Sequence, residues 1–374
     1  MTSIKTKSKV VKSIRSIKSG VIRLPGLIDV HVHFRDPGQT HKEDFYTGTS
    51  AALAGGYTMV VDMPNNADPI VSDRALKSKV KSAKSKVVCD VGFHFGSLGN
   101  NLGELKKVYK KVVGLKLYLN QTTGGFIIDV PAMKKIYRAW HRLTKVKPIL
   151  LHAEEDVMGD VTKVLKEIKH PTHICHISSR AELEPIIKAK KKGLPITCGV
   201  CPHHLFMTKS DVKKLNTFGL MKPSLKTKAD QQYLWKNIKY IDVIESDHAP
   251  HTIEEKKSAP PAGGPPFGVP GLETTLPLLL TAMYKRRITL IEIIQKCHDN
   301  PKRIFNLPTQ RNTYVEVSDS NSKIQNSNLK TKCGWSPFNG RKVRGKVQRV
   351  VLIGKEVYRN GKVLSMKGSG KIIY

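Results

Sequence analysis

Several features that define other classes of protein are scarce or missing in this sequence of 374 residues. No apolar run approaches the roughly 18 to 20 residues that a membrane-spanning helix needs, so nothing here is expected to cross a bilayer. The six cysteines are spread thinly along the chain. This spacing excludes the dense disulfide framework of a small secreted domain and indicates a reducing, cytoplasmic environment.

Acidic residues are few relative to basic ones, with 30 aspartates and glutamates against 64 lysines and arginines, for a formal net charge of +34. Such an excess raises a nucleic acid or another polyanion as a partner. However, the lysine-rich stretches 77–86, 106–111 and 188–192 lack interleaved aromatic residues and match no nucleic-acid-binding motif. We therefore favour a lysine-biased solvated surface, with a basic scaffold or nucleic-acid-binding module as the alternative.

The N-terminal segment has no acidic residue before Asp29 and is rich in lysine, arginine and serine. A transit peptide can have this composition, but the segment lacks a leucine-rich amphipathic repeat. We therefore favour a disordered basic tether over residues 1–20, which would join this domain to another.

Short apolar runs alternate with lysine-rich segments of helical character from residue 21 to about residue 250, which is the pattern of repeated βα units. About eight such units fit a closed (β/α)8 TIM-type barrel, whose active site lies at the C-terminal ends of its strands. The runs are Leu27–Val32, Tyr57–Met63, Val87–Phe95, Val112–Leu119, Pro148–His152, His173–Ile177, Pro195–Val200 and Ile241–Glu245. One large catalytic barrel over residues 26–312 with a modest appendage is therefore predicted.

The last part of the chain has a different pattern. Residues 271–307 indicate two helices, whereas residues 313–374 alternate apolar and polar side chains as β-strands do. We expect these strands to pair with residues 21–25 in a small β appendage, because both segments flank the barrel in sequence. The Ser/Asn/Lys-rich segment 318–332 is expected to be a mobile loop.

Histidines and one aspartate stand at the ends of several apolar runs. His31 and His33 are two residues apart, so the period-2 geometry of a strand sends both side chains to one face. A lone pair of this kind is weak evidence, because histidines also satisfy hydrogen bonds in protein cores. His152, His176 and Asp247 close the fifth, sixth and eighth runs. Four imidazoles and a carboxylate at one barrel mouth predict a metal centre of the hydrolytic kind.

Lys116 lies in the middle of the fourth run, where an unpaired ammonium would be costly to bury. An ion-paired or edge-strand lysine is the conservative interpretation. A metal centre offers another, because a buried lysine amine can add carbon dioxide and become a carbamate that bridges two cations. Such a bridge would let the site hold two metals with an activated water between them.

Longer motifs surround these residues, and together they resemble the dihydroorotases. The motifs are GLIDVHVHFRDPG (26–38), MPN (63–65), GLK (114–116), HAE (152–154), PHHL (202–205) and SDHAPH (246–251). The likeness runs from residue 21 to about residue 363. It is especially clear for the dihydroorotase domain of the CAD-type multifunctional pyrimidine-synthesis proteins of animals, where it includes residues 271–280 and 300–305.

The resemblance implies reversible interconversion of N-carbamoyl-L-aspartate and L-dihydroorotate at two zinc ions, which a carboxylated Lys116 would bridge. The ligands that it implies are His31, His33, Lys116 and Asp247 for one zinc, and Lys116, His152 and His176 for the other. Asp247 would also be the catalytic residue that takes a proton from the attacking water and delivers it to the leaving nitrogen. Because every ligand is present, a non-catalytic copy is disfavoured.

The substrate contacts implied by the resemblance are Arg35, Asn65, Lys222, His251 and Phe267. A guanidinium, an amide and an imidazole offer several donors to a planar carboxylate, which allantoinase or dihydropyrimidinase, the nearest alternatives, would not need in this form. Lys222 stands where the family has an arginine, so the charge is kept but the planar fork is lost. In the lid loop, Thr122 matches the family, whereas Thr123 replaces an aromatic residue.

An additional zinc of the animal pattern would use Cys175 and a glutamate, but Gly199 stands at the position of that glutamate. Cys198 and Cys201 form a CxxC beside it. Strand geometry sends positions three apart to opposite faces, so we interpret this spacing as coincidence. The sequence therefore predicts no more than two tightly bound metals.

The expected partners follow from the same resemblance. They are a small-molecule substrate, further copies of this chain in a homo-oligomer and other pyrimidine-pathway domains such as aspartate transcarbamylase. Neither a membrane nor a nucleic acid is expected as a partner.

Overall fold

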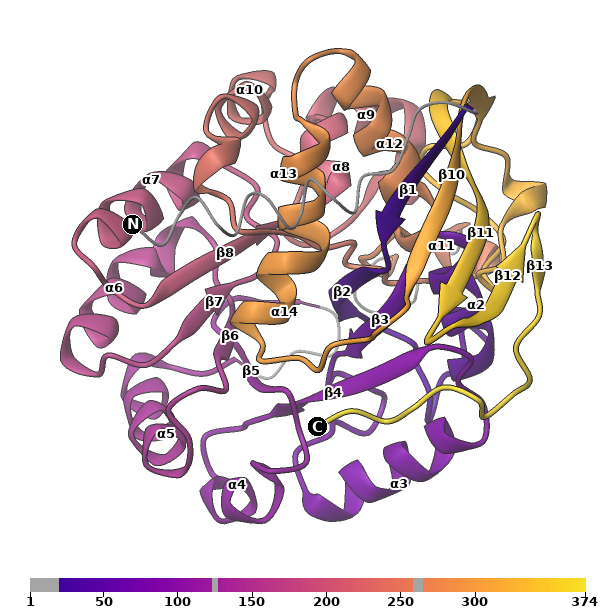
Figure 1. The fold of residues 1–374 in the computed structure, drawn as a ribbon. Helices are drawn as coiled ribbons and strands as arrows, with labels where there is room; N and C mark the ends of the chain where they lie inside the picture. Colours follow the sequence, from indigo (N-terminus) through magenta and orange to yellow (C-terminus); the bar gives the residue numbers. More distant parts are fainter. Residues whose placement is uncertain (1–19, 123–126, 258–264) are drawn as a thin grey trace, which may run out of the picture.

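The computed structural model describes residues 20–122, 127–257 and 265–374. Within these residues, an eight-stranded parallel sheet curls into a barrel in the order β2-β3-β4-β5-β6-β7-β8-β9. A second, five-stranded antiparallel sheet has the order β1-β10-β11-β12-β13 and lies to one side of the barrel (Figure 1). The predicted fold class, a (β/α)8 barrel with a small β appendage, is confirmed.

The barrel strands are short and almost completely buried. They are β2 (Leu27–Val32), β3 (Tyr57–Asp62), β4 (Asp90–Gly96), β5 (Gly114–Tyr118), β6 (Ile149–His152), β7 (Thr172–Ile174), β8 (Ile196–Val200) and β9 (Val243–Ile244). Both faces are covered, because one face lines the barrel interior and the other packs on helices. A parallel bridge between Val32 and His248 links β2 to the chain after β9, so the barrel is nearly closed.

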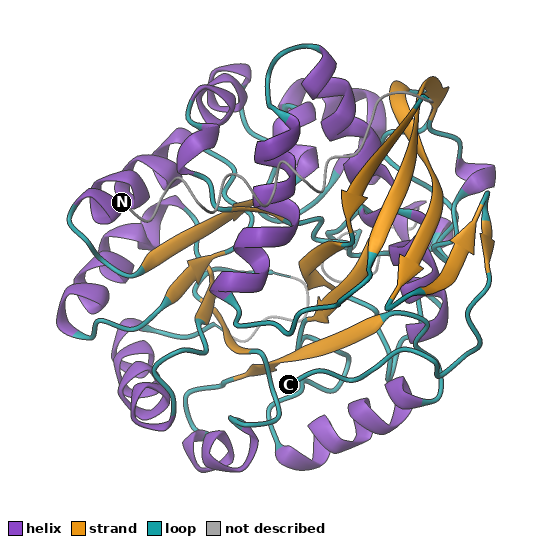
Figure 2. Cartoon of the chain, viewed as in Figure 1, coloured by secondary structure: helices purple, strands orange, loops and turns teal. Residues whose placement is uncertain are grey.

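Helices surround these strands (Figure 2). They are α2 (Phe45–Ala54), α3 (Asp73–Lys84), α4 (Leu102–Val108), α5 (Val130–Leu143), α6 (Met158–Glu167), α7 (Arg180–Lys191), α8 (Pro202–Phe206), α9 (Lys209–Leu215), α10 (Lys228–Lys236) and α11 (Ile253–Lys257). Polar residues start several of them: Asp129, for example, accepts a hydrogen bond from the backbone of Ala132 at the start of α5. Helix α5 then buries Met133, Ile136 and Trp140, a helical spacing that directs one face to the barrel.

Two helical segments follow the barrel, as the sequence predicts. The first is α12 (Leu272–Tyr284), and the second runs from α13 (Leu290–Ile294) through a π-helical turn, η5 (Gln295–Asp299), into α14 (Asn300–Ile304). Phe305 comes next and is 2% exposed. Its ring lies 5.9 Å from that of His94 and 5.3 Å from that of His173, so it packs between side chains of β4 and β7.

The β appendage joins both ends of the described chain. Its strands are β1 (Val21–Pro25), β10 (Tyr314–Lys323), β11 (Lys342–Leu352), β12 (Lys355–Arg359) and β13 (Lys362–Val363). Strand β1 pairs antiparallel with β10, with Ile22 opposite Val317. The last residues return to the barrel, where Ile372 forms a parallel bridge with Val91.

The expectation of a mobile loop over residues 318–332 is wrong. Residues 318–323 continue β10, and Asn321 and Lys323 pair with Arg344 and Lys342 of β11. A short 3-10 turn, η6 (Asn326–Asn328), follows. The prediction failed because it rested on the polar composition. A strand needs no apolar residues where its backbone is paired and its side chains face solvent.

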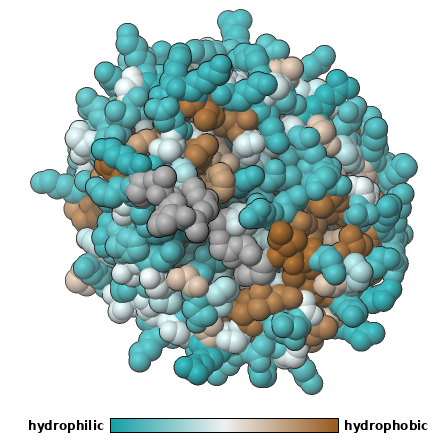
Figure 3. Space-filling view, turned by 180° about the vertical axis from the view of Figure 1, so that it is seen from behind, coloured by the Kyte–Doolittle hydropathy of each residue, from teal (hydrophilic) through white to brown (hydrophobic). Residues whose placement is uncertain are grey.

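The visible surface of the molecule is largely hydrophilic (Figure 3). Figure 3 shows the face opposite to that of Figure 1, where hydrophilic residues predominate and hydrophobic ones gather in limited patches. Across residues 20–122, 127–257 and 265–374, no helix is long and apolar enough to cross a membrane.

Phe305→Ala should lower the free energy of unfolding by about 3 to 5 kcal/mol, because the truncated side chain would leave a cavity between β4 and β7. Urea unfolding of the purified chain measures this change. Ile291→Ala, at a helix position that is 43% exposed, is the control and should change stability by less than about 0.5 kcal/mol. Equal small losses in the two variants would contradict the packing described.

Candidate active site

A polar pocket lies at the barrel mouth, where the C-terminal ends of the strands meet. The residues that line it are His31, His33, Arg35, Asn65, Tyr118, Thr122, His152, His176, Lys222, Asp247, Ala249, Phe267 and Gly268. Two further predicted residues stand directly behind this lining. Lys116 is fully buried on β5, and His251 lies with its Nε2 3.1 Å from Nη2 of Arg35. The structure thus brings the predicted metal ligands and substrate contacts to one place.

Three of these residues occupy backbone conformations that L-amino acids rarely adopt. Arg35, His176 and Asp247 have φ angles of 61°, 38° and 46°. Each follows the end of a barrel strand. Strain of this kind is retained where surrounding contacts enforce it, and it is concentrated at functional sites.

The candidate metal ligands form two neighbouring groups. In the first, Oδ1 of Asp247 lies 3.0 Å from Nε2 of His33 and 3.4 Å from Nε2 of His31. These three residues offer ligand atoms that all lie within 4.8 Å of one another. In the second, Nδ1 of His152 lies 3.1 Å from Nε2 of His176.

The surroundings of these four histidines favour uncharged imidazole rings, the form that binds a cation. Burial lowers the pKa of all four, to about 4 for His31, and the charge of Lys116 lowers each pKa further. The imidazoles of His33, His152 and His176 are therefore neutral near pH 7, with a lone pair to share.

The donor chemistry fits a divalent metal, because neutral imidazoles and a carboxylate are ligands that zinc takes. Nδ1 of His176 and Nδ1 of His31 are also buried without a hydrogen-bond partner among the described residues. Asn65 helps to orient His33, since its Oδ1 lies 2.6 Å from Nδ1 of that ring. This contact fixes Nδ1 as the protonated nitrogen and leaves Nε2 facing Asp247.

Four of the predicted substrate contacts neighbour one another in the pocket: Arg35, His251, Phe267 and Lys222. Arg35 is 4% exposed and donates from Nε to the carbonyl oxygen of Pro250 at 3.3 Å. Burial, with the charge of Arg35 added, lowers the pKa of His251 to about 3. Nζ of Lys222 lies 5.3 Å from the ring centre of Phe267. These residues place a positive charge and several hydrogen-bond donors at one edge of the pocket.

Only one of the two residues predicted for the lid loop belongs to the described part of the chain. Thr122 lines the pocket, whereas Thr123 lies outside the described residues. The basic tether predicted for the N-terminus also falls outside them, up to residue 19.

Two residues near the site escaped the sequence interpretation. Strand alternation could have found Tyr118, which is two positions after Lys116 on β5 and points to the same side. Glu245 comes after the end of β9, where alternation gives no guidance, and only the packing of β8 against β9 reveals its place. The two cysteines of the CxxC have different surroundings. Cys198 donates to the carbonyl oxygen of Tyr240, whereas Cys201 follows β8.

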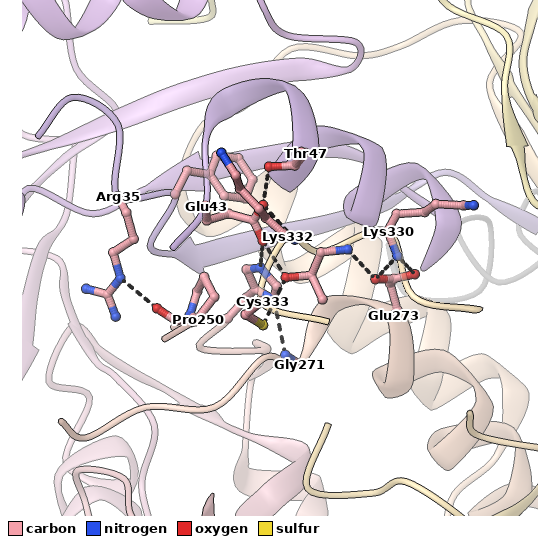
Figure 4. A network of polar contacts seen from close by, with 12 residues as sticks. Arg35, Glu43, Thr47, Pro250, Gly271, Glu273, Lys330, Lys332 and Cys333 are labelled. Atoms are coloured by element: carbon pink, nitrogen blue, oxygen red, sulfur yellow. Dashed lines mark hydrogen bonds and ion pairs between the residues drawn. The ribbon is translucent and has the colours of Figure 1, made fainter. Parts of the chain in front are cut away.

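A strap from the β appendage, residues 330–335, is bound to the barrel mouth by two carboxylates, one of which is buried and the other half-buried (Figure 4). Glu273 accepts hydrogen bonds from the backbone N–H groups of Lys330 and Thr331 at 2.8 and 3.0 Å. Glu43 accepts from the backbone of Lys332 at 3.1 Å and from the hydroxyl of Thr331. The appendage is therefore fastened to the barrel through buried and half-buried polar groups.

The strap also reaches the loop that carries Asp247. Glu43 faces Nε2 of His248 at 3.3 Å, and Nδ1 of the same ring accepts a hydrogen bond from the backbone of Gly271. Nε1 of Trp335 donates to the carbonyl oxygen of His251 at 2.7 Å. Because His248 follows Asp247 directly, the appendage supports the backbone that positions this residue.

The fold and the ligand pattern define a metal-dependent hydrolase barrel. Residues 22–310 match the amidohydrolase family. The chain is 44% identical over 357 residues to the multifunctional protein CAD of Squalus acanthias, which covers 94% of this chain. It is 35% identical over 376 residues to the dihydroorotase of Pyrococcus furiosus, covering 96% of this chain and 86% of the relative. The chain therefore belongs to the amidohydrolase family, and within it to the dihydroorotases.

Two further comparisons qualify this result. The chain spans only 16% of the length of the multifunctional relatives that it matches, CAD and pyr1-3 of Dictyostelium discoideum. Among solved structures, the inactive dihydroorotase-like domain of the Chaetomium thermophilum CAD-like protein is similar, with a TM-score of 0.81 and 26% identity. The alignment covers 95% of this chain and 99% of that domain.

Thr331→Val should lower the free energy of unfolding by about 1 to 3 kcal/mol, because the buried Glu43 carboxylate loses a hydroxyl donor while the shape of the side chain is kept. Chemical denaturation measures the loss. Thr162→Val is the matched control, since the Thr162 hydroxyl bonds only within the exposed part of its own helix. A strap that contributes nothing would leave the two variants equally stable.

Proposed function

We propose that this chain is a dihydroorotase that interconverts N-carbamoyl-L-aspartate and L-dihydroorotate at two zinc ions bridged by a carboxylated Lys116. The observation that carries the proposal is the pairing, in one pocket, of a histidine-rich ligand set with a buried guanidinium, Arg35. The first is suited to hydrolysis of an amide and the second to binding a carboxylate. The name of the Pyrococcus furiosus relative supports the same activity.

When bound, two divalent cations would polarise the ring carbonyl and activate water. Oδ1 of Asp247 faces both histidines of its group, and in the proposed reaction this carboxylate would take a proton from the water that attacks the ring carbonyl. It would return this proton to the ring nitrogen as the C–N bond breaks and the chain opens. Cyclisation runs through the same groups in reverse.

Lys116 supports the proposed bridge by its position. Its side chain is fully buried, and Nζ donates to Sγ of Cys175 at 3.2 Å. A carbamate formed at Nζ keeps one N–H, so this sulfur could remain its acceptor and orient the two carbamate oxygens. Cys175 directly precedes His176, and its sulfur lies within 4.8 Å of a ligand atom of His31, so the amine stands near both groups.

Two other functions are weighed against this one. Allantoinase or dihydropyrimidinase activity would share the metal ligands, but the carboxylate-binding side of the pocket favours dihydroorotate. A basic scaffold or nucleic-acid-binding module rests on the net charge of +34, and a salt-dependent shift with DNA or RNA would support it. The complete ligand set argues against an inactive domain like that of the Chaetomium relative.

The association of this chain with other domains is also a proposal. The match to the multifunctional relatives supports a chain that works beside other pyrimidine-pathway domains, such as aspartate transcarbamylase. A homo-oligomeric state and a cytoplasmic location stay predictions, and the six cysteines are free, as a reducing compartment would have them.

Lys116→Ala should abolish hydrolysis of dihydroorotate and lower the bound metal, because the anion that links the two ligand groups is lost. Metal analysis and a hydrolysis assay on the same purified sample measure both effects. Lys190→Ala, on the outer helix α7, is the control and should keep metal and activity. Two metals and near-normal turnover in Lys116→Ala would remove the bridge from the proposal.

Arg35→Ala should leave the metals in place but weaken the productive complex with dihydroorotate by about 2 to 5 kcal/mol, seen as a fall in kcat/KM. The reason is that the substrate carboxylate loses a buried charged donor. Hydantoin and dihydrouracil, which lack that carboxylate, should be poor substrates and should not suffer the same loss.

Arg23→Ala, in strand β1 of the appendage, is the matched control for this variant. The assignment as a dihydroorotase fails if the parent prefers dihydrouracil or allantoin, or if Arg35→Ala hydrolyses dihydroorotate normally.

A further inference from the structure

A second cluster of buried donors adjoins the proposed zinc ligands and shares His31 with them. It consists of His31, Cys175 and Glu245, whose ligand atoms all lie within 4.8 Å of one another. Their side chains are at most 1% exposed. His173 of β7 stands beside the cluster, with its Nε2 3.5 Å from Oε2 of Glu245.

Several atoms of this cluster lack a hydrogen-bond partner. Nδ1 of His31, Nε2 of His173 and Oε2 of Glu245 are buried, and none of them forms a hydrogen bond within the described parts of the chain. Buried polar atoms are paired in the great majority of cases. Oε2 of Glu245 faces both ring nitrogens at distances too long for a good hydrogen bond, an arrangement that fits donors around one shared partner.

The separations in the cluster match those around a coordinated cation. With the bond lengths of tetrahedral zinc sites, about 2.0 to 2.3 Å, neighbouring ligand atoms stand about 3.3 to 3.8 Å apart. Oε2 of Glu245 lies 3.6 Å from Nδ1 of His31 and 3.5 Å from Nε2 of His173. Both separations are longer than a normal hydrogen bond and fall within the range for a metal site.

The carboxylate of this cluster fills space left by a glycine. Glu245 follows strand β9, and its Oε1 accepts a hydrogen bond from the backbone of His176 at 2.6 Å. A Cβ atom built on Gly199 of the adjacent strand β8 would lie 2.3 Å from Oε1 of Glu245. The expectation of no more than two metals rested on the missing side chain at position 199, and Glu245 supplies a carboxylate at that point from the next strand.

The negative charge of Glu245 faces imidazoles rather than a lysine or an arginine. In residues 20–122, 127–257 and 265–374, no lysine or arginine forms an ion pair with it, and its contacts of this kind are with His31 and His173. A buried carboxylate without a counter-charge is unfavourable. A divalent cation would supply that charge, and it would convert the Cys175 thiol to a thiolate ligand on binding.

We propose that His31, Cys175 and Glu245 hold a third divalent cation, for which zinc fits the mixed nitrogen, sulfur and oxygen donors, and that β9 rather than β8 provides the carboxylate. His31 would face this cation through Nδ1, while its Nε2 faces Asp247 at 3.4 Å. The inference rests on the proposed zinc centre because His31 is shared between them.

Sulfur ligation separates this site from the other two, whose ligands contain no sulfur. The full chain would be loaded with zinc chloride, dialysed, analysed for metal and examined by zinc X-ray absorption. We expect three zinc equivalents and a sulfur ligand at about 2.3 Å. A cobalt-substituted sample should show thiolate-to-cobalt charge-transfer absorption.

Variants then assign the ligands. Cys175→Ser should lose the sulfur signal and one equivalent. Glu245→Gln keeps an acceptor for the His176 N–H but should also lose one equivalent. Cys198→Ser, a buried cysteine outside the cluster, is the matched control and should keep three equivalents and the sulfur signal.

The contrary outcomes are distinct from failure of the proposed function. Two equivalents without sulfur, together with normal dihydroorotate hydrolysis, would overturn the third site and leave the dihydroorotase assignment intact. A chain that binds no zinc would overturn both. A sulfur signal that survives Cys175→Ser would point instead to Cys201, which lies near His203 and His204, and would overturn the present assignment.

Discussion

A fully buried lysine amine inside the barrel is the constraint on which the rest of the site depends. Lys116 has no solvent exposure, and its Nζ donates to a cysteine sulfur rather than to a carboxylate. A charge in such surroundings must be compensated. The neighbouring histidines cannot supply a negative charge, and burial keeps them neutral. The proposed carboxylation would convert the amine to an anion that binds cations, which would remove this conflict and at the same time give the imidazoles their partners.

Much of this arrangement could be predicted from the sequence, because it follows from rules that act along one strand. The spacing of His31 and His33 fixes their common face, and the barrel rule places His152, His176 and Asp247 at the same mouth. The contribution of Glu245 could not be predicted in this way. It depends on the space beside a glycine in the adjacent strand, which only the packing of β8 against β9 reveals.

The segment 318–332 shows a second limit of such reasoning. Its polar composition suits a loop, but the first part completes a paired strand and the last part carries the strap. The groups that hold the strap, Glu43 and Glu273, lie 50 or more residues away in sequence, as do most contacts that decide whether a polar segment is ordered. No local pattern contains that information.

The strap explains how strained residues are kept at the barrel mouth. A left-handed conformation at Arg35 and at Asp247 costs free energy, so the surrounding contacts must over-determine it. His248 is held between Glu43 and the backbone of Gly271, and Arg35 is held by Pro250 and His251. Because the strap bonds to Glu43 and to the carbonyl oxygen of His251, it supports both turns at once. The appendage therefore contributes to the geometry of the candidate metal ligand Asp247 and of the proposed carboxylate pocket alike, although none of its described side chains lines the pocket.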